Sequence, residues 1–126
     1  MSLVKPTASP PAYDATVLPE LLGTDYPNDE LQRQVIGEFL KSLPGALQAI
    51  ERALLDNDVP ALRMQMHTLK ATSATVGAME IAEITYRQDA LLTAGGAAID
   101  HLGAQLAAMF SRFEAALALH RAKVNL

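Results

Sequence analysis

The sequence predicts an all-α protein, an antiparallel up-down four-helix bundle with a short additional helix near the N-terminus. In four successive segments apolar residues recur at steps of three and four, the spacing of one helix face, and no segment shows the alternation of a strand. Ala and Leu abound, Trp is absent and aromatic residues make up 5% of the chain, a composition that favours helix. A chain of 126 residues is long enough for a single domain with one hydrophobic core.

The N-terminal segment differs in composition from the rest of the chain. Residues 1–12 contain three prolines among Ser, Thr and Ala, which is typical of a disordered tail or linker. We therefore expect the folded bundle to cover residues 13–126. Its first element is a short helix from Val17 to Leu22, which Gly23 should end.

The second predicted helix is long. It should begin after Pro27, with Asn28 or Asp29 as its cap and acidic residues in its first turn. Pro44 lacks the N–H that a helix interior needs, so we expect the helix to kink or split near Ser42. The apolar face of this helix consists of Leu31, Val35, Phe39, Leu43, Leu47, Ile50 and Leu54.

The third predicted helix follows the segment Asp56-Asn57-Asp58. Pro60 suits its first turn, and Gly77 suits a left-handed residue that ends the helix after Val76. At about 100° per residue, one continuous stripe of side chains should face the core. The stripe consists of Leu62, Met66, Leu69, Ser73 and Val76.

Two further helices complete the bundle. The fourth covers about Met79 to Thr93 and has a less regular inner face, and Gly95-Gly96 breaks the chain after it. The fifth covers about Ala98 to His120. The expected inner residues of the fourth helix are Ile81, Ile84, Ala90 and Leu91. Those of the fifth are Ile99, Leu102, Leu106, Met109, Phe113 and Leu117.

His67 is the candidate functional residue. It lies more than a third of a turn from the centre of the apolar stripe of its helix, so its imidazole should be exposed. Its neighbours on that face are Arg63, Met64, Lys70, Ala71 and Ala74. The two alanines form a low platform that a partner could approach, and Met64 offers it a soft apolar contact. An exposed imidazole beside a cation suits a phosphoryl carrier, although a solvated surface histidine has the same periodicity.

The segment from His67 to Gly77 resembles the signature of histidine phosphotransfer (HPt) domains, roughly His-x-Leu-Lys-Gly-(Ser/Ala)-(Ser/Ala)-x-x-Leu-Gly. The His, the Leu, the Lys, a small pair and the final Gly match, whereas Ala71 replaces the family Gly and Val76 replaces the family Leu. The resemblance extends over about residues 17–122. It implies that His67 accepts a phosphoryl group on the ring nitrogen farther from the backbone, and that Lys70 neutralises part of its charge.

The resemblance also implies the partners. These are response-regulator receiver domains, whose aspartyl phosphates exchange the phosphoryl group with His67, and a hybrid sensor kinase is a further candidate. We expect the partner to contact Arg63, Met64, Ala71 and Ala74. The Mg²⁺ that the reaction requires should be bound by the receiver, so we expect this chain to need no cofactor.

Other chemistries lack their motifs. The chain has no Cys, and Met64, Ala98 and Leu117 precede its three histidines by three positions, so the Glu-x-x-His metal motif of helical bundles is missing. Gly95-Gly96 lacks the Lys-Ser/Thr of a nucleotide-binding loop. We therefore expect no metal site, no ATP site and no enzymatic activity of its own. His101 and His120 are interpreted as ordinary surface residues, and Glu80, Glu83 and Asp89 as an exposed helix face.

Charge and hydropathy limit the remaining function classes. The net charge is −4 and no block of basic residues occurs, which argues against binding to nucleic acid or to an anionic membrane surface. No apolar run reaches the length of a membrane-spanning helix.

We expect a cytoplasmic monomer, either free-standing or part of a larger hybrid kinase. Two alternatives stay open: a helical adaptor without phosphotransfer, and the phosphoacceptor domain of a chemotaxis-type kinase.

Overall fold

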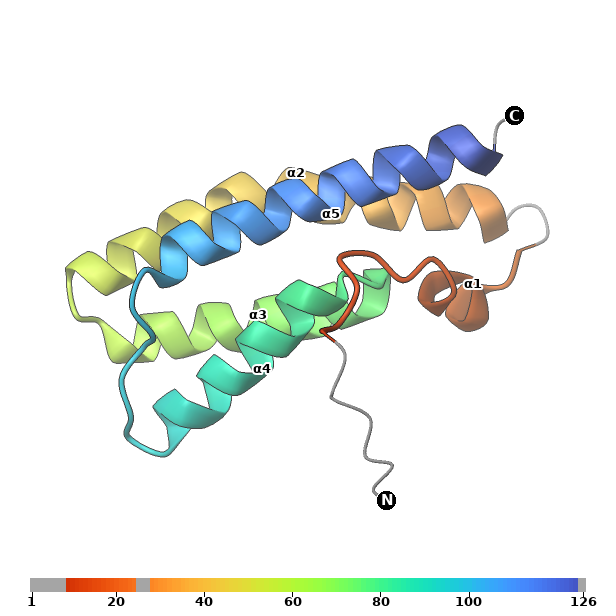
Figure 1. The fold of residues 1–126 in the computed structure, drawn as a ribbon. Helices are drawn as coiled ribbons and strands as arrows, with labels where there is room; N and C mark the ends of the chain where they lie inside the picture. Colours follow the sequence, from red (N-terminus) through yellow and green to blue (C-terminus); the bar gives the residue numbers. More distant parts are fainter. Residues whose placement is uncertain (1–8, 25–27, 125–126) are drawn as a thin grey trace, which may run out of the picture.

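The computed structural model describes residues 9–24 and 28–124, and within them all regular structure is helical. The helices are α1 (Val17–Leu22), α2 (Asn28–Leu55), α3 (Val59–Val76), α4 (Met79–Thr93) and α5 (Leu102–Val124). Helices α2 to α5 alternate in direction, with α2 and α5 in one layer, α3 and α4 in the other, and α1 at one end (Figure 1). The predicted all-α bundle with a short additional N-terminal helix is therefore confirmed.

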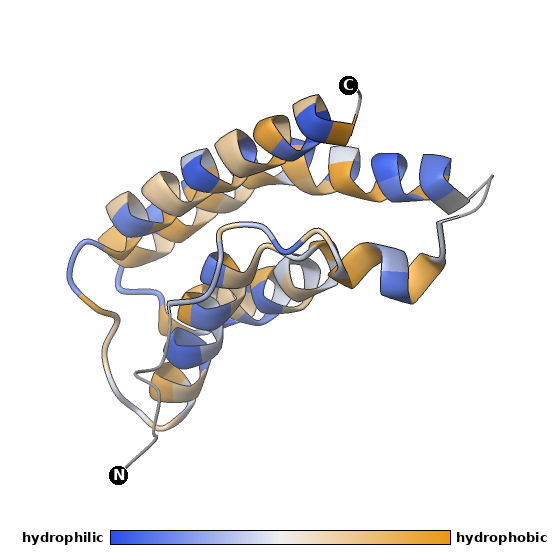
Figure 2. Ribbon diagram, turned by 45° about the vertical axis from the view of Figure 1, so that its right-hand side comes forward, coloured by the Kyte–Doolittle hydropathy of each residue, from blue (hydrophilic) through white to orange (hydrophobic). Residues whose placement is uncertain are grey.

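Hydrophobic side chains fill the space between the two layers. Figure 2 shows the apolar residues gathered on the inward sides of the helices, with polar residues outside. Ile50 of α2, Met66 of α3, Ile81 of α4 and both Leu106 and Phe113 of α5 are fully excluded from solvent. The predicted stripe of α3 is confirmed, because all five of its members are buried.

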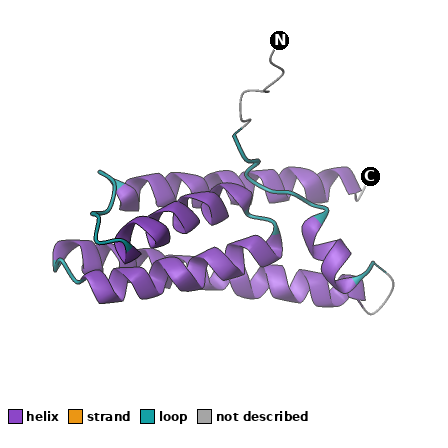
Figure 3. Cartoon of the chain, turned by 90° about the horizontal axis from the view of Figure 1, so that it is seen from below, coloured by secondary structure: helices purple, strands orange, loops and turns teal. Residues whose placement is uncertain are grey.

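The segment before α1 crosses the molecule and is fixed to the start of α4 (Figures 1 and 3). The Pro11 carbonyl accepts a hydrogen bond from the Glu80 amide (3.1 Å), and the Asp14 amide donates to the Gly77 carbonyl (2.8 Å). The Tyr13 ring contacts Phe113 edge-on. Of the predicted tail over residues 1–12, residues 1–8 lie outside the part that the structure describes.

The predicted boundaries of α1 and α3 are confirmed. Gly23 ends α1 with φ +87°. The Asp58 carboxylate accepts a hydrogen bond from the Ala61 amide and so caps α3 at its N-terminus. Gly77 ends α3 in the left-handed conformation, with φ +83° and ψ 16°.

Helix α2 differs from its prediction in two respects. It continues through Pro44, so a split near Ser42 is wrong. Phe39 and Leu43 are buried before the proline and Ile50 after it, and this packing holds the two halves in one helix. Leu31 is 42% exposed. The predicted cap residue Asn28 has a side chain that lies outside the described residues.

The inner face of α4 was predicted correctly only in part. Ala90 and Leu91 are exposed, and Leu92 takes the buried position near the end of the helix. Two polar residues, Thr85 and Gln88, are buried as well. The Thr85 hydroxyl donates to the Ile81 carbonyl in the preceding turn, and the Gln88 side-chain carbonyl accepts from the Ile99 amide in the loop before α5.

Helix α5 begins at Leu102, four positions later than predicted. The Ile99 amide donates to the Gln88 side chain (3.1 Å), and His101 has φ +59°, which is outside the helical region. Ile99 nevertheless packs against the core, as its apolar character predicts. The loop therefore uses an α4 side chain to fix the start of α5, and this long-range contact has no local signal in the sequence.

Gly77→Ala should lower the free energy of unfolding by about 3 kcal/mol or more, because a side chain is strained at this φ and its Cβ would collide with the Asp14 carbonyl. Gly95→Ala is the matched control, since Gly95 has φ +87° and open space around it, and should cost about 1–2 kcal/mol. Urea unfolding followed by circular dichroism measures both. Equal losses would show that contact with Asp14 does not constrain this turn.

Candidate functional site

His67 lies in the middle of α3 on the side opposite to the core. Its side chain is 74% exposed, whereas Met66 and Leu69 on the same helix are buried. The predicted exposure of the imidazole is confirmed. A helix anchored by a buried stripe presents the ring on a rigid base, so the position of the imidazole is set by the fold rather than by a loop.

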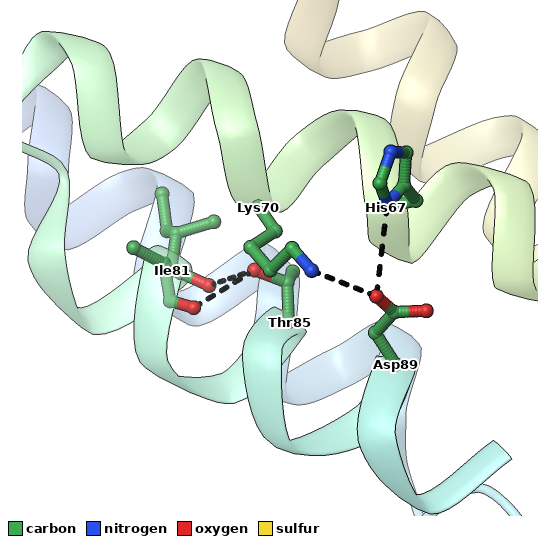
Figure 4. Close-up of polar contacts among 6 residues, drawn as sticks. His67, Lys70, Ile81, Thr85 and Asp89 are labelled. Carbon is green, nitrogen blue, oxygen red and sulfur yellow. Dashed lines mark hydrogen bonds and ion pairs between the residues drawn. The ribbon is translucent and has the colours of Figure 1, made fainter. Parts of the chain in front are cut away.

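Asp89 of α4 faces His67 and Lys70 across the helix pair (Figure 4). The Lys70 Nζ donates a hydrogen bond to Asp89 Oδ2 at 2.8 Å. The same oxygen lies 3.7 Å from His67 Nδ1. The Asp89 side chain is only 17% exposed, so its carboxylate interacts with these two groups more than with solvent.

The interpretation of the α4 acids as one exposed face is wrong for two of them. Besides Asp89, Glu80 is largely covered, with a side chain 20% exposed that pairs with Arg112 of α5 at 2.9 Å. The relation between Asp89 and His67 could have been found from the register of a helical hairpin. Only Gly77 and Ala78 separate α3 from α4, so residues equally distant from this turn lie opposite each other.

The pKa of the Asp89 carboxyl is lowered from its ordinary value of 3.8. The hydrogen bond from Lys70 is the largest cause and outweighs the opposing effect of desolvation, and the charges of Lys70 and His67 add to it. Asp89 is therefore ionised at neutral pH. A carboxylate beside Nδ1 favours a proton on that nitrogen, which leaves the lone pair on Nε2. Figure 4 shows Nε2 on the side of the ring that points away from Asp89.

Lys70 is held from two sides. Besides its hydrogen bond with Asp89, its ammonium lies 5.7 Å from the centre of the Tyr86 ring, within the range of a cation–π contact. The Lys70 side chain is 29% exposed, whereas the Tyr86 ring is largely open to solvent. The positive charge predicted to lie beside His67 is present, and in this arrangement it faces a carboxylate.

The four predicted partner-binding residues lie around His67 at the surface. Ala71 and Ala74 are exposed and leave the ring accessible, and Met64 is 67% exposed. Arg63 is exposed one turn before His67. Beside the ring is a shallow hollow of about 360 Å³, which is lined by Pro60, Arg63, Met64, His67 and Asp89.

A second surface feature runs between α2 and α3. It is an open, mainly apolar groove of about 540 Å³, and a neighbouring hollow of about 320 Å³ shares Ser42 and Thr72 with it. The second hollow reaches Thr68, the residue after His67. The groove is lined by Leu31, Gln34, Val35, Glu38, Phe39, Ser42, Thr72, Thr75 and Val76.

The two other histidines lie elsewhere. His101 is in the loop before α5, and His120 near the end of α5 contacts the Tyr13 ring. Within residues 9–24 and 28–124, no group of three or more His, Asp or Glu side chains is placed to hold a metal ion. No helix in this part of the chain is long and apolar enough to cross a membrane.

Comparison with known proteins gives one result. The family model described as Hpt domain matches residues 34–120, a range that includes His67, Lys70 and Asp89. Searches of curated proteins and of solved structures returned no match.

Asp89→Asn should lower the free energy of unfolding at neutral pH by about 1 kcal/mol or less, because it weakens a partly exposed ion pair. The lowered pKa means that the carboxylate stabilises the fold above the unfolded-state value of 3.8 and that this contribution is lost as the pH falls through the folded-state pKa. The difference between parent and variant should therefore shrink below about pH 4. Urea unfolding across this range measures it, and a constant difference would show that the charge of Asp89 is not its source.

Proposed function

The chain belongs to the Hpt domain family, whose members are phosphocarrier modules of two-component signalling, and from this premise we propose that it carries a phosphoryl group on His67 between aspartyl-phosphate receiver domains. One observation carries the assignment to His67. Its ring is exposed in the middle of α3, with Nδ1 facing an ionised carboxylate and Nε2 open to a partner.

The proposed step is an attack by His67 Nε2 on the phosphorus of the partner's phosphoaspartate. The N–P bond forms, the P–O bond to the partner's carboxyl breaks, and the electron pair leaves with that carboxylate. The imidazole becomes cationic in this step, since Nε2 gives up its lone pair while Nδ1 keeps its proton. The Asp89 carboxylate lies 3.7 Å from Nδ1, and its negative charge stabilises the positive charge that develops on the imidazole. The reverse step passes the group to another receiver.

In this proposal Lys70 neutralises charge at the site. Its hydrogen bond with Asp89 indicates that it does so by compensating the Asp89 carboxylate. Because the ammonium donates to Asp89, it compensates the carboxylate that would otherwise repel the incoming phosphoryl group. The same contact holds Asp89 in place beside Nδ1. Phosphoryl transfer depends mainly on positioning and on charge, so these two effects are the contributions that a carrier domain can make.

The partner proposed for this surface is a receiver domain, alone or within a hybrid sensor kinase. It would bring its own acidic site and the Mg²⁺ bound there, so the carrier would need no cofactor. The exposed Met64 and the low side chains of Ala71 and Ala74 support a docking surface on the His67 side of α3. Arg63 on the same side adds a positive charge to a surface that must accept a phosphorylated partner.

His67→Gln should abolish phosphoryl acceptance and leave the fold intact, because the ring is exposed and outside the core stripe. The measurement is acid-labile label on the chain after mixing with a panel of phosphorylated receivers, with circular dichroism as the folding control. His101→Gln and His120→Gln are the matched variants and should accept label at the parental rate. Label retained by His67→Gln, or no label on the parent with any receiver, would contradict the proposal.

Ala74→Arg should slow transfer from every receiver, because a long charged side chain would stand where the partner must approach His67. Helicity should be preserved, since Arg is a good helix former and the site is exposed. Ala108→Arg makes the same change at an exposed position of α5 and should have no effect. Parental transfer rates for Ala74→Arg would place the docking surface away from this face of α3.

A further inference from the structure

We propose that Arg63 binds the phosphoryl group carried by His67, and that Lys70 serves chiefly as the partner of Asp89. The inference rests on the proposed function, which places the phosphoryl group on His67. It divides the two cations beside the imidazole between two different anions, one that belongs to the fold and one that arrives with the partner.

The charges at the site create the need for a second cation. Before transfer, the ammonium of Lys70 and the carboxylate of Asp89 compensate each other at 2.8 Å. A phosphoryl group on a side chain adds a charge of about −1.5 to −2 at neutral pH. If Lys70 turned toward this group it would leave Asp89 uncompensated beside it. The cationic imidazole offsets only part of this charge while Nδ1 keeps its proton. The site is therefore left with a net negative charge once His67 is phosphorylated, unless another cation comes within reach.

Arg63 occupies the position from which a side chain can supply that charge. It precedes His67 by four residues, so the two side chains are neighbours on the surface of α3. Lys70 follows His67 by three residues, so the two cations bracket the imidazole along the helix axis. Arg63 and His67 also line the same hollow of about 360 Å³.

The Arg63 guanidinium is available for an incoming anion. It is exposed and forms no ion pair with any residue in the described ranges 9–24 and 28–124. Arg87 on α4, in contrast, pairs with Glu83. A guanidinium presents parallel N–H groups that fit two phosphoryl oxygens, which an ammonium cannot match. The free charge, the shared hollow and this chemistry together point to a phosphoryl oxyanion as the ligand of Arg63.

The test uses the full chain alone, phosphorylated by phosphoramidate. In this reaction the N–P bond at His67 forms as the P–N bond of the reagent breaks and ammonia leaves, so no receiver is needed. Two quantities are measured for the parent, Arg63→Gln and Arg63→Lys: the lifetime of phosphohistidine at neutral pH, and the midpoint of the phosphoryl titration followed by ³¹P NMR. Arg52→Gln is the control, because it removes an exposed arginine from α2 instead of α3.

Arg63→Gln should shorten the phosphohistidine lifetime about three- to tenfold, the effect of losing a charge-assisted hydrogen bond at a partly exposed site. It should also move the ³¹P midpoint to higher pH, because a nearby cation favours the dianion over the monoanion. Arg63→Lys should retain the midpoint in part, since it keeps the charge but loses the paired N–H groups. Arg52→Gln should change neither quantity.

An unchanged lifetime and midpoint in Arg63→Gln would overturn the proposal. If, with both of these unchanged, the variant accepted the phosphoryl group from a receiver more slowly than the parent does, Arg63 would be a docking residue. Both results would leave the proposed function standing, because the parent would still be labelled at His67. Failure of every receiver to exchange phosphate with the parent would instead contradict the proposed function, and the phosphoramidate measurements would still decide the role of Arg63.

Discussion

The tight turn at Gly77 fixes the geometry on which the site depends. Its left-handed backbone ends α3, and the next helix begins at Met79, so α3 and α4 return side by side in a single register. From outside the hairpin, the Asp14 amide donates to the Gly77 carbonyl. The Asp14 carbonyl oxygen lies so close to Gly77 that a Cβ there would collide with it. These two helices form the most extensive interhelical contact of the described chain. This register brings Asp89 opposite His67.

As a consequence, His67 lies beside Lys70 of its own helix and beside Asp89 of the next helix. Lys70 is placed by helical periodicity alone, whereas Asp89 is placed by the turn. Because the same Asp89 oxygen faces both Lys70 Nζ and His67 Nδ1, moving α4 by one residue would separate the ammonium from its partner and the imidazole from its carboxylate. The proposed tautomer of His67 is thus a property of the helix pair.

The parts of this structure that could be predicted from sequence are those encoded locally. The stripe of α3, the Asp58 cap and the left-handed Gly77 each follow from periodicity or from the chemistry of one residue. The parts that were missed depend on contacts between distant elements. The late start of α5 requires Gln88, and the burial of Asp89 requires the α3–α4 register. For the same reason the site prediction contained Lys70 but not the carboxylate that it binds.

The segment from His67 to Gly77 therefore combines two kinds of constraint. His67 and Lys70 lie on the outer side of α3, where both face the Asp89 carboxylate. Leu69, Ser73 and Val76 are buried on its inner side. Ser73 is fully buried, and its hydroxyl has no hydrogen-bond partner among the described residues, so polarity does not explain its presence. A small side chain there would allow α3 to lie close to its neighbours, at the cost of an unsatisfied polar atom.

The difference between outward-facing and inward-facing positions of this segment also explains why Ala can replace the family Gly at position 71. That position is exposed and helical, so nothing in the fold requires a missing side chain, and Ala favours the helix by about 1 kcal/mol. Beyond this effect on the helix, we expect the added methyl group to influence how closely a partner can approach the imidazole. Gly77, in contrast, is required by its backbone and by Asp14. Of the two motif glycines, the one retained here is the one on which the register of the site depends.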